Sequence, residues 1–278
     1  MQHVTIFQAL AFARRDIDRV DAYMLLQYVL DATQVHLLTH PDQMLSAQQL
    51  EEFYHLVKRR IAGVPVAYLT GERAFYDLIL SVNEAVLIPR PETELLVELA
   101  LQLIPLDRSC RVLDLGTGSG AIAITIAKHR LQSHVTAVDV SPAAMAVCQS
   151  NAQNLQIHNL QLIEGSWFDE LSGERFDLIV SNPPYVAGTD PHLQQGDLRF
   201  EPQLALSAGD DGLSCINHII HKAPNHLEKG GWLLLEHGYD QASACRQLLQ
   251  DRDFSNICSH PDLAGIMRVS GGQLNFVK

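Results

Sequence analysis

The sequence lacks the cysteine pattern of a disulfide-bonded protein or a thiolate metal site. Its 278 residues contain five cysteines, and no two of them form a Cys-x-x-Cys pair. Scattered cysteines in an odd number are typical of reduced thiols packed inside a cytoplasmic protein. We therefore expect a cytoplasmic protein without disulfide bonds.

Signals for export, membrane insertion and metal binding are also missing. The N-terminus shows no basic stretch followed by an apolar one, and no apolar run is long enough to cross a bilayer. His218 and His221 lie one helical turn apart, but no carboxylate or third ligand is placed with them. These patterns predict neither a membrane protein nor a metal site.

Positive charge is scarce. Lysine and arginine total 20 against 32 aspartates and glutamates, which gives a net charge of −12. A surface that binds the phosphate backbone of nucleic acid has the opposite balance, so we do not expect nucleic acid as the direct substrate. Apolar residues make up 47% of the chain, which is enough for a large core and too many for a disordered protein.

The hydrophobic pattern divides the chain into three parts. They are a helical domain, a β-hairpin linker and an α/β domain, at residues 1–73, 74–88 and 89–278 respectively. In the first part, Ile6, Leu10 and Ala13 share one helical face. Ser46-x-x-Gln49 is a capping box, because each side chain can satisfy the free amide of the other residue. The first part is therefore expected to be a small all-α bundle.

The third part alternates strands with helices. Pro91 is placed to begin a helix that runs to about Leu103. Strands follow at Arg111–Leu115, His134–Val138, Leu160–Ile163, Asp177–Val180 and Trp232–Glu236. Further helices are predicted at Ser119–His129, from Ser141, at Leu213–Leu227 and at Gln241–Leu249, with a closing strand pair at Phe254–Cys258 and Gly265–Val277. Such alternation gives a parallel sheet that is covered on both faces.

A glycine-rich turn joins the first of these strands to its helix. The turn reads Asp114-Leu115-Gly116-Thr117-Gly118-Ser119-Gly120. Glycines let the backbone approach a ligand closely, and the helix start offers free N–H groups. Asp139 ends the next strand, where the hydroxyls of a ribose need an acceptor. This pair fits S-adenosylmethionine and equally a nicotinamide or flavin nucleotide, and a tight turn without a ligand uses the same glycines.

The motif Asn182-Pro183-Pro184-Tyr185 follows the fourth strand. Each proline fixes its own φ and forces the preceding residue into an extended conformation. The side-chain oxygen of Asn182 and the carbonyl of Pro183 can therefore face one small volume, with Tyr185 as a flat wall. Two such acceptors suit a planar NH₂ group, and a methyl group that is already activated on a sulfonium needs mainly alignment with that nitrogen. The motif therefore favours S-adenosylmethionine as the cofactor.

These groups fall at one edge of the predicted sheet. The glycine turn, Asp139, Trp167 and Asn182 each follow a strand, and parallel sheets bind ligands at the carboxyl ends of their strands. The indole of Trp167 suits an adenine neighbour and equally suits core packing. The sequence thus predicts a cofactor beside an acceptor nitrogen.

The chain resembles the PrmC (HemK) family of bacterial methyltransferases over nearly its whole length. The similar stretches are Gly63–Gly71, Val86–Glu94, Asp114–Gly120, Asn182–Tyr185, Phe200–Pro202, Asp211–Leu213 and Glu236–Gln241. The resemblance implies a Rossmann-like S-adenosylmethionine-dependent methyltransferase domain with a mostly parallel seven-stranded sheet. It also implies methyl transfer to N5 of the glutamine in the Gly-Gly-Gln motif of peptide-chain release factors, with the helical domain recognising the release factor.

The resemblance assigns roles to individual residues. The expected cofactor contacts are Gly116, Thr117, Gly118, Ser119, Gly120, Asp139, Trp167 and Asn182. The expected contacts of the acceptor glutamine are Asn182, Pro183, Pro184 and Tyr185, and the expected catalytic residues among them are Asn182, Pro183 and Tyr185.

Other functions stay open at this point. An N-methyltransferase acting on an exocyclic amino group of adenine or guanine could use the same pocket, with Tyr185 stacked on a flipped base. A nicotinamide-dependent oxidoreductase would use the glycine turn but leave Asn182–Tyr185 unexplained. A binding protein without catalytic activity could keep the same fold.

Two further segments carry expectations. Residues 186–211 are polar with little periodicity, which predicts a loop beside the active site that orders when the protein partner docks. Gly271-Gly272-Gln273 matches the acceptor motif within this chain. Automethylation is conceivable there, but we expect this stretch to be a turn before the last strand.

Overall fold

The computed structural model describes residues 4–275 of the chain. Its contacts divide the chain into two compact units, Met1–Glu72 with Gln195–Phe200 and Arg73–Gln194 with Glu201–Lys278. The first unit is helical, and the second is built on a seven-stranded sheet. Nothing in the sequence indicated that Gln195–Phe200 belongs with the helical unit, from which it is separated by more than a hundred residues.

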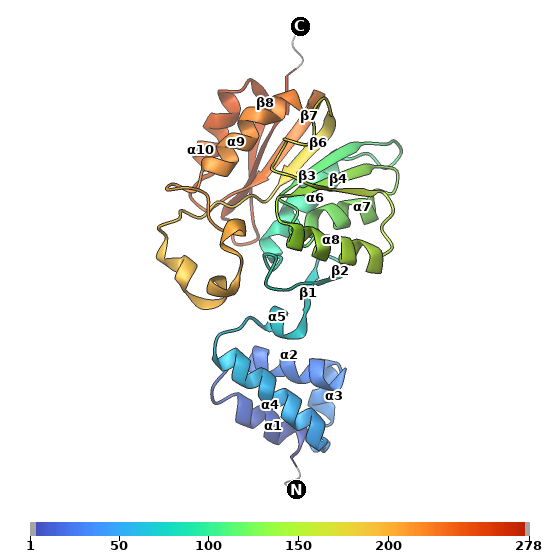
Figure 1. Cartoon of the computed structure of the whole chain (residues 1–278), viewed down its shortest axis with the longest axis vertical. Helices are drawn as coiled ribbons and strands as arrows, with labels where there is room; N and C mark the ends of the chain where they lie inside the picture. Colours follow the sequence, from blue (N-terminus) through green and yellow to red (C-terminus); the bar gives the residue numbers. More distant parts are fainter. Residues whose placement is uncertain (1–3, 276–278) are drawn as a thin grey trace. The chain divides into compact units, whose positions relative to one another are not determined.

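Helices pack around one apolar core in the first unit (Figure 1). They are α1 (Ile6–Ala13), α2 (Arg19–Leu30), α3 (Gln34–Thr39), α4 (Ala47–Ile61) and α5 (Val66–Thr70). Ile6, Leu10 and Ala13 are buried on one face of α1, as predicted. The capping box is confirmed, because the side chains of Ser46 and Gln49 each accept a hydrogen bond from the other residue's backbone N–H.

Charged contacts attach the segment Gln195–Phe200 to this helical unit. Asp197 forms an ion pair with Arg60 of α4, whose Nε also binds Asp21 of α2 at 2.6 Å. Arg199 donates a hydrogen bond to the carbonyl of Ala62 at 3.3 Å. The short helix η3 (Gly196–Phe200) is therefore part of the helical unit.

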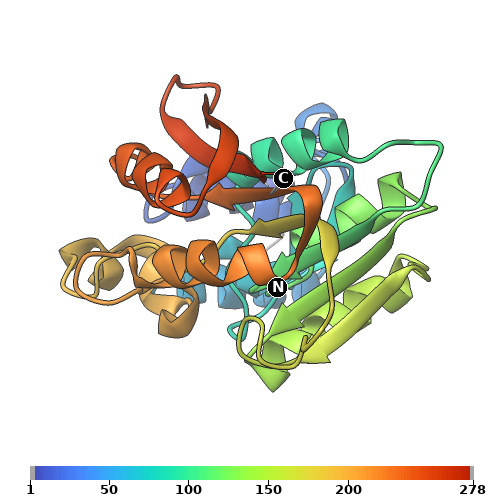
Figure 2. The same cartoon turned by 90° about the horizontal axis from the view of Figure 1, so that it is seen from above.

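Seven strands of the second unit form one twisted sheet (Figure 2). They are β3 (Arg111–Leu115), β4 (His134–Asp139), β5 (Leu160–Glu164), β6 (Phe176–Ser181), β7 (Leu227–Glu236), β8 (Phe254–Pro261) and β9 (Met267–Leu274). Their order is β5-β4-β3-β6-β7-β9-β8, and β9 runs opposite to the other six strands. The predicted, mostly parallel sheet is confirmed, and its order reverses between β3 and β6, where such sheets bind ligands.

Helices cover both faces of the sheet. The elements are α6 (Glu94–Leu103), α7 (Ala121–His129) and α8 (Pro142–Asn154) on one face, and α9 (Ser214–Lys222) and α10 (Ala242–Gln250) on the other. Val112 and Leu178 point into the core on the side of α6, α7 and α8. Leu113 and Ile179 point into the core on the side of α9 and α10. This division follows from the strand geometry, because successive side chains of a strand face opposite ways.

The predicted hairpin forms from β1 (Glu72–Phe75) and β2 (Leu78–Ser81). Phe75 and Leu80 are buried in the core that α7 also fills. The Asn151 side chain of α8 exchanges hydrogen bonds with the backbone N–H and carbonyl of Ser81, at 2.7 and 3.0 Å. From Arg73 onward the hairpin therefore packs within the second unit.

Some predicted boundaries are wrong. The helix predicted to reach Leu227 ends at Lys222, because Pro224 cannot continue an α-helix, and Leu227 already begins β7. The polar stretch 186–211 contains the short helices η2 (Pro191–Gln194), η3 and η4 (Gln203–Ala205). The predicted strand end at Val277 lies outside the described residues.

Candidate active site

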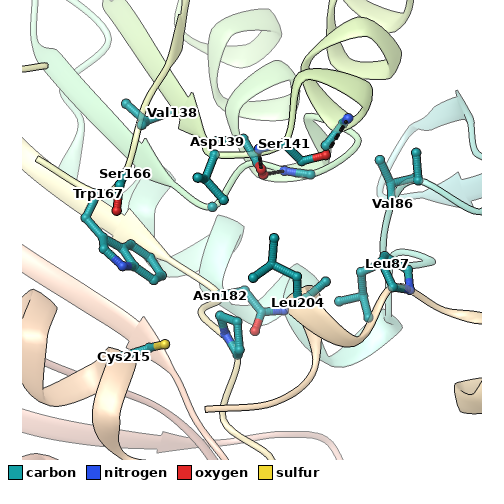
Figure 3. Close-up of a pocket in the computed structure, with 18 of the residues that line it drawn as sticks. Val86, Leu87, Val138, Asp139, Ser141, Ser166, Trp167, Asn182, Leu204 and Cys215 are labelled. Carbon is teal, nitrogen blue, oxygen red and sulfur yellow. Dashed lines mark hydrogen bonds between the residues drawn. The ribbon is translucent and has the colours of Figure 1, made fainter. Parts of the chain in front are cut away.

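A cavity of about 320 Å³ lies in the second unit at the carboxyl ends of β3, β4, β5 and β6. Residues at or just after the ends of these strands line one part of it: Gly116, Gly118, Val138, Asp139, Val140, Gly165, Ser166, Trp167, Asn182 and Pro184. Two other segments add to the lining, with Ala85, Val86 and Leu87 from one and Pro202, Leu204, Ala205 and Ser207 from the other, and Ser141, Ala144 and Cys215 line it as well. Figure 3 shows Asp139, Trp167, Asn182 and Leu204 around this space.

The glycine turn presents its backbone to the cavity. Gly116 and Gly118 adopt φ values of +72° and +57°, in the left-handed region that favours glycine. The N–H of Gly116 donates to the carbonyl of Val138 at 2.8 Å, and that of Gly118 donates to Oδ2 of Asp139 at 2.8 Å. The turn after β3 is thus pinned to the end of β4.

The remaining residues of the turn lie behind this surface. Thr117 and Ser119 are buried, and neither they nor Gly120 line the cavity. A Cβ at Gly120 would lie 2.6 Å from Sγ of Cys148 and 2.6 Å from Cδ1 of Ile124. The packing of the turn therefore requires glycine at position 120.

The buried carboxyl of Asp114 stabilises the glycine turn. Oγ1 of Thr117 donates to Oδ2 of Asp114 at 2.7 Å, and Asp114 is fully buried. Burial raises the pKa of Asp114 to about 7, against the hydrogen bond from Thr117, which lowers it. Asp114 is thus a carboxyl that changes charge near neutral pH.

Asp139 sits where the sequence placed it, at the end of β4 and in the wall of the cavity. Its Oδ1 accepts from the N–H of Ser141 at 2.9 Å, and its Oδ2 accepts from Gly118. A carboxylate oxygen has room for a further hydrogen bond. Asp139 is therefore both fixed in place and able to accept from a guest.

Trp167 lies between the core and the cavity. Its side chain packs against the core that contains Phe168, and it also lines the cavity. Its backbone has a φ of +52°, which is rare for a bulky residue and is tolerated where the surroundings hold it. The ring is thus held at the rim between the core and the cavity.

Only part of the Asn-Pro-Pro-Tyr motif reaches the cavity. Asn182 and Pro184 line it, whereas Pro183 is buried and Tyr185 is outside the lining. Nδ2 of Asn182 donates to Oγ1 of Thr93 at 3.1 Å. This bond leaves the amide oxygen Oδ1 for a guest.

Tyr185 is held at three points. Its hydroxyl donates to Oε1 of Glu236 at 3.2 Å, and its carbonyl accepts from Nε2 of Gln241 at 3.0 Å. Gly212, with a φ of +72°, lies so close to this carbonyl that a Cβ would collide with it. Burial raises the pKa of Tyr185, and the charge of Glu236 raises it further. The hydroxyl is therefore a proton donor and not a phenolate.

Glu236 ends β7 and is 1% exposed. Burial raises its pKa to about 7, while hydrogen bonding from Thr93 and Tyr185 and the charge of Arg268 lower it. Its Oε2 is buried without a well-formed hydrogen bond in the described part of the chain. Sequence reasoning assigned no role to Thr93 or Glu236, although a glutamate at the end of an apolar strand was a usable signal.

The second lining segment is tied down by another carboxylate. Glu201 is 4% exposed, accepts from the N–H of Ile88 at 3.1 Å and forms an ion pair with Arg90. These contacts join the stretch that precedes Pro202 to the stretch that follows Leu87. Two segments that are distant in the sequence therefore meet at the mouth of the cavity.

The Gly-Gly-Gln stretch of this chain lies inside a strand, so the predicted turn is wrong. Gly271–Gln273 pairs with β7 on one side and β8 on the other. Nε2 of Gln273 donates to the carbonyl of Gly230 at 2.8 Å, and its Oε1 accepts from Asn256 at 2.8 Å. The Gln273 amide is therefore engaged at both its nitrogen and its oxygen, which disfavours automethylation.

Residues 4–275 contain no group of three or more His, Cys, Asp or Glu side chains that could hold a metal ion. Within the same range, every helix is too short or too polar to cross a bilayer.

The fold is shared with known methyltransferases. Residues 92–197 match the family described as Methyltransferase small domain, and residues 5–71 match the PrmC N-terminal domain. The structure of a 16S rRNA N2 methyltransferase of T. thermophilus with AdoMet and guanosine aligns with a TM-score of 0.53 and 20% identity, over 73% of this chain and 50% of that one. Fold and sequence together define a methyltransferase.

Full-length relatives identify the family. The release factor glutamine methyltransferase of Xylella fastidiosa is 50% identical over 264 residues, which cover 95% of this chain and 96% of the relative. That of Vibrio cholerae is 49% identical over 259 residues, with coverage of 93% and 90%. The chain therefore belongs to the family of release factor glutamine methyltransferases.

Proposed function

We propose that this protein transfers the methyl group of S-adenosylmethionine to N5 of the glutamine in the Gly-Gly-Gln motif of peptide-chain release factors. One geometric observation carries the proposal. Asn182 lines the same cavity as Asp139 and Trp167, so that an amide-binding group and the candidate cofactor contacts share one space. The reaction would take place in the cytoplasm, where the five free cysteines stay reduced.

The cavity fits the parts of S-adenosylmethionine. Asp139 offers a fixed carboxylate to the ribose hydroxyls, and Trp167 offers an aromatic surface to the adenine. Gly116 and Gly118 bring backbone to the cavity without side chains. The remaining members of the turn, Thr117, Ser119 and Gly120, shape it from behind. The cofactor supplies an activated methyl group on a sulfonium when bound.

Asn182 holds the acceptor amide. Because its Nδ2 donates to Thr93, its Oδ1 is left to accept an N–H of the glutamine. The carbonyl of Pro183 is the proposed second acceptor, and Pro184 and Tyr185 are the proposed walls. Aligning the amide nitrogen with the methyl carbon contributes on the order of 7–11 kcal/mol to such a step. No strong general base is required, because the nitrogen loses its proton to a carbonyl or to water after it becomes cationic.

The helical unit is the proposed site of release factor recognition, at Met1–Glu72 with Gln195–Phe200. The stretch 186–211 follows the acceptor motif. Its segment Gln195–Phe200 belongs to the helical unit, and the segment from Pro202 to Ser207 contributes to the lining of the cavity. We expect it to become more ordered when the release factor docks. Equal protease sensitivity of this stretch with and without release factor would count against that expectation.

The proposed function is tested by mass spectrometry of an unmethylated release factor after incubation with enzyme and S-adenosylmethionine. The expected product carries one added methyl group on the Gly-Gly-Gln peptide, at the glutamine side chain. A release factor with that glutamine changed to asparagine is the matched control. A parallel incubation with labelled cofactor and nucleic acid covers the alternative substrate, and label in nucleic acid alone would overturn the proposal.

A further inference from the structure

The two ends of the acceptor motif are held by side chains that lie outside the motif. Tyr185, the last residue of the motif, donates to Oε1 of Glu236 at 3.2 Å. Asn182, the first residue, donates to Oγ1 of Thr93 at 3.1 Å, and Thr93 in turn lowers the pKa of the Glu236 carboxyl. Glu236 and Thr93 come from different segments, the end of β7 and the helix η1 (Pro91–Thr93). Tyr185 therefore reaches the carboxyl of Glu236 directly, whereas Asn182 reaches it by way of Thr93.

The direction of these hydrogen bonds depends on where one hydrogen lies. The hydroxyl of Thr93 has a single hydrogen, which an ionised Glu236 attracts. Oγ1 of Thr93 can then only accept from Asn182, and this fixes the carboxamide with Nδ2 toward Thr93 and Oδ1 free. If Thr93 pointed its hydrogen at Asn182 instead, the carboxamide would turn over and present an N–H to the acceptor amide. Two N–H donors facing each other make no bond.

We propose that Thr93 and Glu236 are positioning residues that fix the carboxamide of Asn182 with Oδ1 toward the acceptor nitrogen. Glu236 takes the hydrogen of Thr93, and through Tyr185 it holds the far end of the same motif. This inference rests on the proposed function, because it names the groups that prepare Asn182 for the acceptor. Neither residue lines the cavity, so both act through Asn182 and Tyr185.

Protonation of Glu236 reverses the arrangement. A neutral carboxyl no longer needs the hydrogen of Thr93, so the hold on Asn182 weakens as Glu236 gains a proton. The groups that act on Glu236 are Arg268 of β9, which lowers its pKa, and Glu92 of η1, which raises it. His237 is adjacent and buried, and burial lowers its pKa, so it is neutral near pH 7. Methyl transfer should therefore lose rate as the pH falls through about 7.

The first test uses steady-state methylation of the release factor. Thr93→Val keeps the shape of the side chain but removes the hydroxyl, whereas Thr93→Ser keeps the hydroxyl. We expect Thr93→Val to lower kcat by about tenfold to a hundredfold with little change in the KM for S-adenosylmethionine. Thr93→Ser should recover most of the wild-type kcat. A Thr93→Val enzyme with wild-type kcat would overturn the proposal.

The second test is the pH profile of kcat. In wild type, kcat should fall as the pH is lowered through about 7. In Glu236→Gln, this fall in kcat should be absent. Asp114→Asn is the matched control and should keep it, because Asp114 also titrates near 7 but supports the other turn. Tyr185→Phe should move the fall to higher pH, because the hydrogen bond of Tyr185 lowers the pKa of Glu236. An unchanged acid side in Glu236→Gln would contradict the role of this carboxyl.

A readout without turnover separates this inference from the proposed function. The NMR signals of the Asn182 side-chain amide, identified by their loss in Asn182→Asp, should shift with pH in wild type but not in Glu236→Gln. They should also move in Thr93→Val. If wild type methylates no release factor, the proposed function fails, and these signals still decide the inference. Asn182 amide signals that are the same in wild type, Glu236→Gln and Thr93→Val would overturn the inference.

Discussion

The turn after β3 and the turn after β6 reach the same cavity but are stabilised in different ways. The first is supported locally, since Thr117 bonds to Asp114 three residues away and Gly116 bonds to the neighbouring strand. The second depends on partners that are remote in the sequence. Thr93 is 89 positions from Asn182, and Glu236 is 51 positions from Tyr185. A local turn can be recognised from its own residues, whereas the second turn needs the whole sheet in place.

This difference predicts which substitutions affect catalysis and which affect stability. The largest effect is expected for Asn182→Ala, which removes the oxygen that receives the acceptor amide. We expect kcat to fall by about a hundredfold or more, while the affinity for S-adenosylmethionine, measured by calorimetric titration, weakens only a few-fold. Unchanged turnover would refute the role of Asn182.

The glycine turn is expected to respond through folding. In Gly120→Ala the new Cβ meets Cys148 and Ile124 at a φ of +85°, so unfolding in urea should show a loss of about 2–4 kcal/mol. Gly118→Ala is the matched comparison, because its Cβ meets nothing within 4 Å. It should lose only about 1–2 kcal/mol from its backbone conformation. Equal losses in the two variants would show that packing against α8 does not set the requirement at Gly120.

Asp114, which supports the turn after β3, should make the stability of the protein depend on pH. Its pKa is raised to about 7 from an ordinary value of 3.8, so its contribution to stability is present below about pH 4 and is lost as the pH rises through 7. In Asp114→Asn that loss is absent. The free energy of unfolding of the variant, relative to wild type, should therefore improve between pH 4 and 7.5, by on the order of a few kcal/mol. A constant difference over this range would contradict the raised pKa.

The smallest effect concerns the chain beyond the second turn. Arg60→Met removes the ion pairs with Asp197 and Asp21, each of which is partly exposed and contributes about 1 kcal/mol or less. Cleavage by a protease within 195–200 should become faster, with a loss of overall stability of no more than about 2 kcal/mol. Lys58→Met, on the exposed side of the same helix, is the control. Equal cleavage rates in both variants would show that Arg60 does not hold this segment.

The sequence was sufficient for the sheet, its helices and the local turn. The apolar runs placed β3, β4, β5 and β6 to within about two residues. This was possible because parallel strands that are buried on both faces are near-continuous apolar runs in the sequence. It was also sufficient for the positions of Asp139 and Asn182 at one edge, since strand ends in a parallel sheet converge. These predictions depend on short-range patterns.

The sequence was not sufficient for the contacts between distant segments. Neither Thr93 nor Glu236 belongs to a motif that by itself describes a bond to Asn182 or Tyr185. Likewise, the ion pair between Glu201 and Arg90 and the attachment of Asp197 to Arg60 depend on how the chain returns after long intervals. Register and packing decide such contacts, and the pattern of a single segment does not contain them.

The most direct measurement is a crystal structure of the protein with S-adenosylmethionine and a Gly-Gly-Gln peptide. The expected result has the ribose on Asp139, the peptide amide on Oδ1 of Asn182, and the methyl carbon within about 3.5 Å of the amide nitrogen. A cofactor bound with its methyl group turned away from Asn182, or a peptide amide that contacts Nδ2 instead of Oδ1, would contradict the proposed site.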